Sequence, residues 1–230
     1  MTKIFCDIAD KNLIEKFQKK KIVKGFTTNP SLMRKAGARD YKSYSLQILK
    51  KTNKPISFEV FSDDEKGMIQ QGEEIRKWGK NIYVKIPILN SKGEFMGKVI
   101  KNLNSKNIKL NITAVYTASQ TRKILKSINK KTKVIISIFA GRMADVGKDP
   151  IPVFKKSIKL AKSYKNVQIL WASTREPYNY LQASNLKCHI ITVPPNIIEK
   201  IEKFGKSYLM LTTDTVKGFL IDSKKSKYKI

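Results

Sequence analysis

Short apolar segments alternate with amphipathic segments along the whole chain. The short segments are rich in isoleucine and valine and are bounded by polar or turn-forming residues, which is typical of buried β-strands. Between them, apolar residues recur at spacings of three and four, as they do on one face of an α-helix. We predict eight strands, over residues 3–7, 22–28, 56–61, 82–87, 109–114, 133–139, 167–173 and 188–193.

No linker interrupts this alternation, and eight strand–helix units in 230 residues predict an α/β fold, a (β/α)8 TIM barrel that forms a single domain over residues 1–230. A doubly wound open sheet is the alternative, although no GxGxxG motif follows a predicted strand. An extra helix is predicted over residues 213–224. Ser62 and Glu65 have the spacing of a capping box at the start of the helix that follows the third strand.

The segment NIYVKIPIL, residues 81–89, places one lysine inside an otherwise apolar run. Ile82, Val84 and Ile86 share one side of the predicted strand, and Lys85 points to the other side. An ammonium group that is buried without a partner is strongly unfavourable. Lys85 therefore needs either an ionic partner or a chemical role.

Polar residues cluster where the predicted strands end, and barrel enzymes carry their chemistry at these carboxyl ends. The candidate site residues are Asp7, Asn29, Glu59, Lys85, Asn111, Thr113, Ser137, Arg142, Ser173 and Arg175. Each has a plausible structural explanation when taken alone, so the functional prediction depends on their convergence. Alternation along the strands predicts that the barrel interior receives Glu59, Lys85, Asn111, Thr113, Ser137 and Ser173.

A lysine at such a position has a specific chemical use. Burial disfavours the charged form and makes a free amine available, which can add to a ketone and form a Schiff base. The Schiff base is an electron sink for cleaving the adjacent carbon–carbon bond. Glu59 and Thr113 are placed to hold the water of this reaction, and Asp7 to handle the proton of a substrate hydroxyl. The structural alternative is a Lys85–Glu59 ion pair that only stabilises the barrel.

The strand-end motifs resemble those of a known family. DIAD, TTNPSL, FEV, VKIP, NITAVY, SIFAGR and ASTR occur in the order found in transaldolases, most closely the short class that includes the fructose-6-phosphate aldolases. The resemblance covers nearly the whole chain and implies a class I aldolase-like barrel. The C-terminal DTVKGFLID also resembles the final helix of that class, which implies a homo-oligomer, a pentamer or decamer formed through this helix.

The resemblance implies a role for each candidate residue. Lys85 would form the Schiff base, Glu59 and Thr113 would position the catalytic water, and Asp7 would be the acid and base. Substrate hydroxyls would be held by Asn29, Asn111 and Ser137, and the sugar phosphate by Arg142, Ser173 and Arg175. No metal or cofactor is implied, and the partners would be sugar phosphates.

Two reactions remain open within this family. The aldolases usually carry glutamine and tyrosine where this chain has Glu59 and Phe139, so the chain is more similar to transaldolases. This implies transfer of dihydroxyacetone from sedoheptulose 7-phosphate or fructose 6-phosphate to glyceraldehyde 3-phosphate or erythrose 4-phosphate. AVYT, which begins just after Thr113, is more similar to the aldolases. Trp171 is expected to pack rather than to contact the substrate; a pocket narrowed by Trp171 is the alternative, which would alter the choice of sugar.

The net charge of +29 suggests a nucleic-acid or other polyanion binder as an alternative function. The lysines, however, are spread as short pairs and triplets near predicted helix ends, and only six residues are arginine, the preferred reader of bases. We therefore expect a lysine-rich surface without specific nucleic-acid recognition. A barrel without catalytic activity is a further alternative. It is disfavoured because each position that the Schiff-base chemistry requires holds a residue able to perform that step.

The remaining composition suggests a cytoplasmic protein. Cys6 and Cys188 are too few for a disulfide framework. Adjacent strand residues face opposite sides, so Cys188 and His189 cannot share a metal ion, and we expect no metal site. Neither a signal peptide nor a membrane span is expected, because Asp7 breaks the first apolar stretch and no apolar run approaches the roughly 20 residues of a span.

Overall fold

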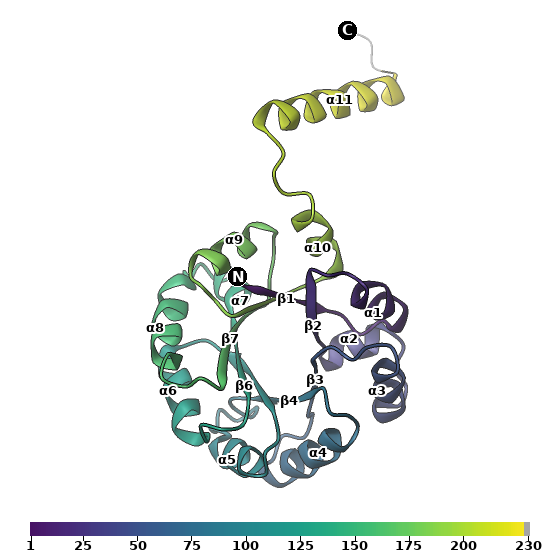
Figure 1. Ribbon diagram of the computed structural model, residues 1–230. Coiled ribbons are helices and arrows are strands. Elements are labelled where there is room, and N and C mark those ends of the chain that lie inside the picture. Colours follow the sequence, from purple (N-terminus) through teal and green to yellow (C-terminus); the bar gives the residue numbers. More distant parts are fainter. Residues whose placement is uncertain (228–230) are drawn as a thin grey trace.

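A computed structural model describes residues 1–227. Eight parallel strands, hydrogen-bonded in chain order, close into a barrel (Figure 1). This confirms the predicted (β/α)8 fold and excludes the open sheet. The strands are β1 (Lys3–Asp7), β2 (Val23–Thr27), β3 (Ile56–Glu59), β4 (Ile82–Pro87), β5 (Leu110–Val115), β6 (Val134–Phe139), β7 (Val167–Ala172) and β8 (Ile190–Val193).

Helices surround the barrel, and one further helix projects away from it (Figure 1). They are α1 (Lys11–Gln18), α2 (Pro30–Lys35), α3 (Tyr41–Leu49), α4 (Glu65–Lys77), α5 (Gly97–Ser105), α6 (Ala118–Ser127), α7 (Ala140–Ala144), α8 (Ile151–Ala161), α9 (Tyr178–Asn185), α10 (Pro195–Ile201) and α11 (Tyr208–Ser226).

Most aliphatic residues of the strands face outward, onto the helices. Val84 and Ile86 of β4 are fully buried in one large cluster with helix residues such as Met68 and Phe154. Each fully buried aliphatic side chain contributes about 1.5–3 kcal/mol. This layer between barrel and helices forms most of the core.

The barrel interior is also apolar toward the amino-terminal ends of the strands. Phe5, Tyr83, Ile135, Leu170 and Ile190 meet there in a second, smaller cluster. Gly25 on β2 makes room for the ring of Phe5, because a Cβ at this glycine would lie 2.6 Å from a ring carbon. The apolar cluster closes the barrel, so the interior can be polar only nearer the carboxyl ends of the strands.

Polar residues replace this apolar layer toward the carboxyl ends. Asp7 pairs in register with Thr27, and Lys85 lies between Glu59 and Asn111 on the neighbouring strands. Residues that pair across parallel strands point to the same side of the sheet. The register therefore aims these side chains into the mouth of the barrel.

The C-terminal helix α11 confirms the predicted extra helix and is longer than predicted. None of its residues is buried, and its exposed apolar side chains include Tyr208, Leu209, Phe219 and Leu220. Within residues 1–227, no helix is both long and apolar enough to cross a membrane.

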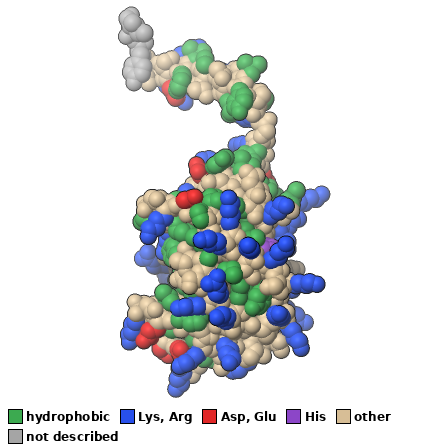
Figure 2. Space-filling model, turned by 90° about the vertical axis from the view of Figure 1, so that its left-hand side faces the viewer, with side chains coloured by type: hydrophobic (Ala, Val, Ile, Leu, Met, Phe, Trp, Pro, Cys, Tyr) green, Lys and Arg blue, Asp and Glu red, His purple; other side chains and the backbone are tan. Residues whose placement is uncertain are grey.

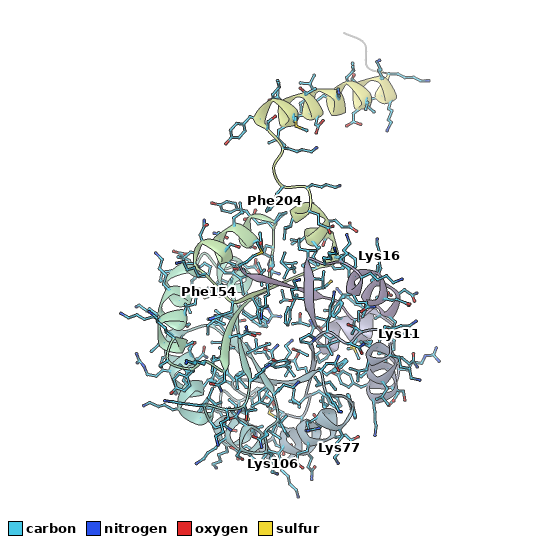
Figure 3. All side chains as sticks on the ribbon, viewed as in Figure 1. Lys11, Lys16, Lys77, Lys106, Phe154 and Phe204 are labelled. Atoms are coloured by element: carbon cyan, nitrogen blue, oxygen red, sulfur yellow. The ribbon has the colours of Figure 1, made fainter. Side chains whose placement is uncertain are left out.

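One local prediction was wrong, and the packing expected for Trp171 is confirmed over the alternative of a narrowed pocket. Asp64, rather than Ser62, caps α4: its carboxylate accepts from the Gly67 amide at 2.8 Å, while the Ser62 hydroxyl donates to Asp64. Trp171 does not narrow the barrel mouth. It is 1% exposed and points outward, where its ring stacks on Phe154 of α8 with centroids 4.4 Å apart. Figure 3 labels Phe154.

Candidate active site

A pocket of about 220 Å³ opens at the carboxyl ends of the strands. Nine of the ten candidate residues line it, and the tenth, Glu59, reaches it through its contact with Lys85. The other lining residues are Thr27, Phe139, Ala172 and Thr192. The predicted convergence of these side chains is therefore observed, while their roles stay predictions.

Lys85 lies at the centre of the polar layer. Its side chain comes from β4, and the residue is only 7% exposed. The Nζ atom lies 3.0 Å from Oε2 of Glu59 and donates to the carbonyl oxygen of Thr28, also at 3.0 Å. The lysine thus has the partner that its burial requires, and Nζ still borders the pocket.

Glu59 is held in place by a tyrosine from outside the barrel. The hydroxyl of Tyr41, on α3, accepts a hydrogen bond from the backbone amide of Glu59 and donates one to its carbonyl oxygen, each at 3.0 Å. Burial raises the pKa of Tyr41, so its hydroxyl keeps its proton. Two bonds to one peptide segment fix the end of β3 that carries the carboxylate.

Asp7 lines the same pocket as Lys85 and is half-buried. Its Oδ1 accepts a hydrogen bond from the Thr27 hydroxyl at 2.6 Å, and Thr27 in turn lies 2.6 Å from the Thr192 hydroxyl. Burial raises the pKa of Asp7, against the opposing effects of Lys85 and the Thr27 hydrogen bond. A carboxylate in such surroundings is a better base than an exposed one.

A hydrogen-bonded row of side chains lines the opposite wall. Ser137 donates to Oδ1 of Asn111 at 2.7 Å, and the Asn111 amide donates to the Ser57 hydroxyl at 3.0 Å. These bonds orient the amide and the hydroxyl before any substrate binds.

Thr113 differs from this row because its buried hydroxyl has no hydrogen-bond partner within the described chain. A bulge in β5 follows it, with Ala114 in the left-handed conformation at φ 58°. A buried hydroxyl without a partner is unfavourable by about 1–3 kcal/mol. Its position on the pocket wall suits a water molecule or a substrate oxygen as the missing partner.

Ser173 reaches the pocket by a route that alternation did not predict. It shares strand parity with Ile169 and Trp171, which face outward, so the expectation that it faces inward by alternation was wrong. β7 ends at Ala172, and Ser173 itself adopts φ 62°. This left-handed residue redirects the chain, and Ser173 lines the pocket.

Two arginines stand at the rim. The guanidinium of Arg175 pairs with the carboxylate of Asp145 through two parallel contacts, one from Nε to Oδ1 at 3.0 Å and one from Nη2 to Oδ2. The pair lowers the pKa of Asp145 and raises that of Arg175. Arg142 lies over the ring of Phe139, 5.3 Å from its centroid. The rim therefore offers positive charge to an anionic group.

Asn29 has a structural task besides its place at the pocket. Its Oδ1 caps α2 by accepting from the Leu32 amide at 2.9 Å, and Pro30 occupies the first helical turn. The cap fixes the side chain, so that its amide nitrogen remains available.

Several residues of the site were not predicted. Ser57 lies on the same strand face as Glu59, and Thr192 follows Ile190 by two positions, so the alternation used for the other strands would have found both. Tyr41 had no such signal, because its contact with β3 depends on how α3 packs.

The site combines a lysine–carboxylate pair in the polar mouth of a (β/α)8 barrel with two arginines at the rim. These are the groups that Schiff-base chemistry on an anionic carbonyl compound requires. Residues 4–229 match the family model described as Transaldolase/Fructose-6-phosphate aldolase, and the chain belongs to this family.

Curated relatives agree with this assignment. A protein of Thermoanaerobacter sp. (strain X514) named "Probable transaldolase" is 33% identical over 229 residues, which cover 99% of this chain and 100% of that one. One of the same name from Nitrosopumilus maritimus (strain SCM1) is 33% identical, covering 98% and 96%. A crystal structure titled "a putative phosphonomutase from Burkholderia cenocepacia J2315" matches with a TM-score of 0.60 at 9% identity, over 94% of each chain, and supports the fold alone.

Proposed function

We propose that the protein is a transaldolase, which moves a dihydroxyacetone unit from a ketose phosphate to an aldose phosphate through a Schiff base on Lys85. The observation that carries this proposal is the buried Lys85 Nζ, 3.0 Å from the Glu59 carboxylate and open to a polar pocket. We place the reaction in the cytoplasm, in the pentose phosphate pathway.

Formation of the Schiff base needs two proton transfers. Glu59, the carboxylate nearest to Nζ, takes a proton from the ammonium, and the free amine adds to the C2 carbonyl of the ketose. The resulting carbinolamine loses its hydroxyl as water, for which Glu59 returns the proton. The unpartnered hydroxyl of Thr113 holds the departing water.

Cleavage follows when Asp7 accepts the proton of the C4 hydroxyl. The C3–C4 bond breaks, its electron pair moves into the iminium, and the aldose phosphate leaves with a new carbonyl at the former C4. An enamine of dihydroxyacetone stays on Lys85. It attacks the carbonyl carbon of the acceptor, Asp7 returns its proton to the new hydroxyl, and water releases the product ketose.

The phosphate lies at the arginine rim in this proposal. Arg142 and Arg175 supply two positive charges, and Ser173 supplies a hydroxyl and backbone groups. The planar guanidinium suits a phosphate dianion, since it donates two parallel hydrogen bonds. Asp145 keeps Arg175 oriented while no anion is bound. Asn29, Asn111 and Ser137 hold the sugar hydroxyls.

Phe139 favours transfer over simple aldol cleavage. Its ring borders the pocket and carries no hydroxyl that could deliver a proton to the enamine. The enamine therefore persists until an acceptor aldehyde arrives, whereas protonation would release free dihydroxyacetone.

The test is to trap the intermediate. The protein is incubated with fructose 6-phosphate and borohydride, and the added mass is located by peptide mapping. We expect a reduced dihydroxyacetone adduct on Lys85, and turnover only when erythrose 4-phosphate is present. Lys85→Met should abolish both, while Lys92→Met, at an exposed lysine in the connection after β4, should abolish neither.

Other outcomes would change the assignment. Steady release of dihydroxyacetone without an acceptor would assign an aldolase. Absence of any adduct with ketose phosphates would leave Lys85 and Glu59 as a structural ion pair.

A further inference from the structure

The amino-terminal end of the barrel is rich in lysine and poor in carboxylates. Seven connections lead from a helix into a strand at this end, and each contains at least one lysine and no Asp or Glu. The connections at the opposite end carry Asp10, Asp63, Asp64, Glu94 and Asp145, among others. The two ends of the barrel therefore differ in charge.

A pocket of about 730 Å³ opens at this basic end, on the far side of the barrel from the candidate active site. Six lysines line it: Lys3, Lys24, Lys130, Lys131, Lys133 and Lys165. No carboxylate lines the pocket, and among residues 1–227 none of the six forms an ion pair.

The charges at this end also act on two neighbouring lysines, in addition to the effect of burial. Burial lowers the pKa of Lys54, and the charge of Lys24 lowers it further. Lys109 behaves in the same way, with burial as the larger cause and Lys133 as the next. A group of like charges without counterions stabilises a bound anion, because the anion relieves their mutual repulsion.

We propose that this pocket, which we call the basic pocket, binds a compact polyphosphate, an anion with three or more linked phosphate groups. Lysine suits such an anion because it acts as a mobile point charge, and the pocket contains no arginine for bidentate recognition of a particular shape. The volume lies within the range of small-molecule sites, about 300–1,000 Å³.

The floor of the pocket argues against a nucleic-acid strand. Phe5 and Tyr83 form part of it but are only 4% and 7% exposed, so neither offers a ring face for a base to stack on. Single-stranded nucleic acids are held largely by such stacking. A short phosphate chain needs only the charges that the pocket supplies.

Two sources share this chemistry: inorganic polyphosphate and the triphosphate group of a nucleotide. Calorimetric titration of the full-length protein at one fixed ionic strength distinguishes them. The probes are inorganic tripolyphosphate, ATP and AMP. Tripolyphosphate is expected to bind with one site per chain and AMP at least about tenfold more weakly, since it has a single phosphate. If ATP binds with the same affinity as tripolyphosphate, the site recognises the phosphates alone. If ATP binds clearly more tightly, the site also recognises the nucleoside.

General surface charge needs a matched control, because lysines also cover the flank formed by α6 and α8 (Figure 2). The test variant is Lys24→Gln/Lys131→Gln/Lys165→Gln, and the control is Lys155→Gln/Lys156→Gln/Lys159→Gln on α8. Both remove three exposed lysine charges. We expect the first to weaken tripolyphosphate binding about tenfold or more, and the second less than about twofold.

Arg142→Ala/Arg175→Ala separates this site from the active-site rim and should leave tripolyphosphate binding unchanged. The proposal is overturned if both triple variants weaken binding equally, if the arginine variant abolishes it, or if single-stranded RNA binds more tightly and tripolyphosphate does not displace it. Melting curves of each variant establish that it is folded.

Discussion

The charge of Asp7 is disfavoured by its surroundings in the pocket. Burial raises its pKa above the ordinary value, while Lys85 and Thr27 only partly oppose the shift. The folded state therefore binds this proton more tightly than the unfolded state. Stability from this group is greatest at low pH and falls as the pH rises from the ordinary aspartate value through the raised one.

Asp7→Asn removes this unfavourable charge and keeps an oxygen for the Thr27 hydroxyl. We expect it to abolish dihydroxyacetone transfer and to raise the melting temperature at pH 7 by about 2–4 °C, the shift that 1 kcal/mol produces in a domain of this size. Melting curves between pH 3 and pH 8 measure the effect. The gain should disappear at the acid end, and a gain independent of pH would contradict this explanation.

Tyr41 supports catalysis in our interpretation without touching the substrate. Tyr41→Phe removes both hydrogen bonds to the Glu59 backbone, so the carboxylate loses its fixed distance from Nζ. We expect kcat to fall about tenfold with little change in KM, since misplacement of a catalytic group affects the chemical step more than binding. Steady-state kinetics across pH are the measurement.

Tyr44→Phe is the matched control, because the Tyr44 hydroxyl, on the same helix, donates to the Ala36 carbonyl at 3.0 Å. Both variants lose stability of about 1 kcal/mol for each hydrogen bond removed. Only Tyr41→Phe should lower kcat. Equal kinetic losses would mean that α3 acts through stability alone.

The side chains of the site were predictable wherever a strand is regular. Glu59, Lys85, Asn111 and Ser137 follow the alternation of their strands and lie where it placed them. Ser173 does not, because a left-handed residue has no signature in the hydrophobic pattern. Trp171 has the outward parity, so its packing against Phe154, rather than a narrowing of the pocket, agrees with the alternation.

At the scale of elements, α7 and the end of β7 approach each other at Gly141. A Cβ on this glycine would lie 1.7 Å from the carbonyl oxygen of Ser173, a distance that no small adjustment removes. The close approach brings Arg142, on α7, and Ser173 to the same pocket. The glycine therefore positions the arginine rim.

Gly141→Ala must push these two elements apart. We expect a loss of about 1–3 kcal/mol in the free energy of unfolding, as for overpacking, and a several-fold rise in KM for sugar phosphates. Chemical denaturation and kinetics measure the two effects. Gly218→Ala on α11, where no atom of the described chain beyond the adjoining helical residues lies within 4 Å of the added Cβ, should leave KM unchanged; a normal KM in Gly141→Ala would show that the rim does not depend on this contact.

The elements themselves were largely predictable. The strands over 3–7 and 82–87 were predicted with the observed bounds, and the others differ by two residues or fewer at each end. The predicted bounds are wrong only at strand ends, because the hydrophobic pattern and the last hydrogen bond between neighbouring strands do not end at the same residue. The cap of α4 was predicted two residues too early. Ser62 and Asp64 both have side chains that can cap a helix, and Asp64 is the one that does so.

At the scale of the whole molecule, the two ends of the barrel and α11 have different surroundings. One end holds the candidate active site and the other the basic pocket. Helix α11 stands away from both, with apolar side chains in solvent (Figure 1). Most helices in proteins depend on the packing of an apolar face for their stability. We therefore expect a partner to cover the apolar side chains of α11.

We propose that a second copy of the chain covers α11, which would give the homo-oligomer that the resemblance implies. Val216→Glu/Phe219→Glu/Leu220→Glu places three charges among its exposed apolar side chains and should turn the oligomer into a monomer, because burying an unpaired charge is strongly unfavourable. Sedimentation velocity at micromolar concentration measures the state of assembly.

Lys217→Gln/Lys224→Gln/Lys225→Gln changes the net charge by the same three units at exposed positions that lie, around the helix, away from the centre of the face formed by Val216, Phe219 and Leu220, and it should leave the oligomer intact. Both variants should keep the barrel folded, since no residue of α11 is buried. A wild-type chain that sediments as a monomer would show that α11 does not self-associate. Dissociation of both variants would mean that charge alone, rather than loss of the apolar surface, separates the copies.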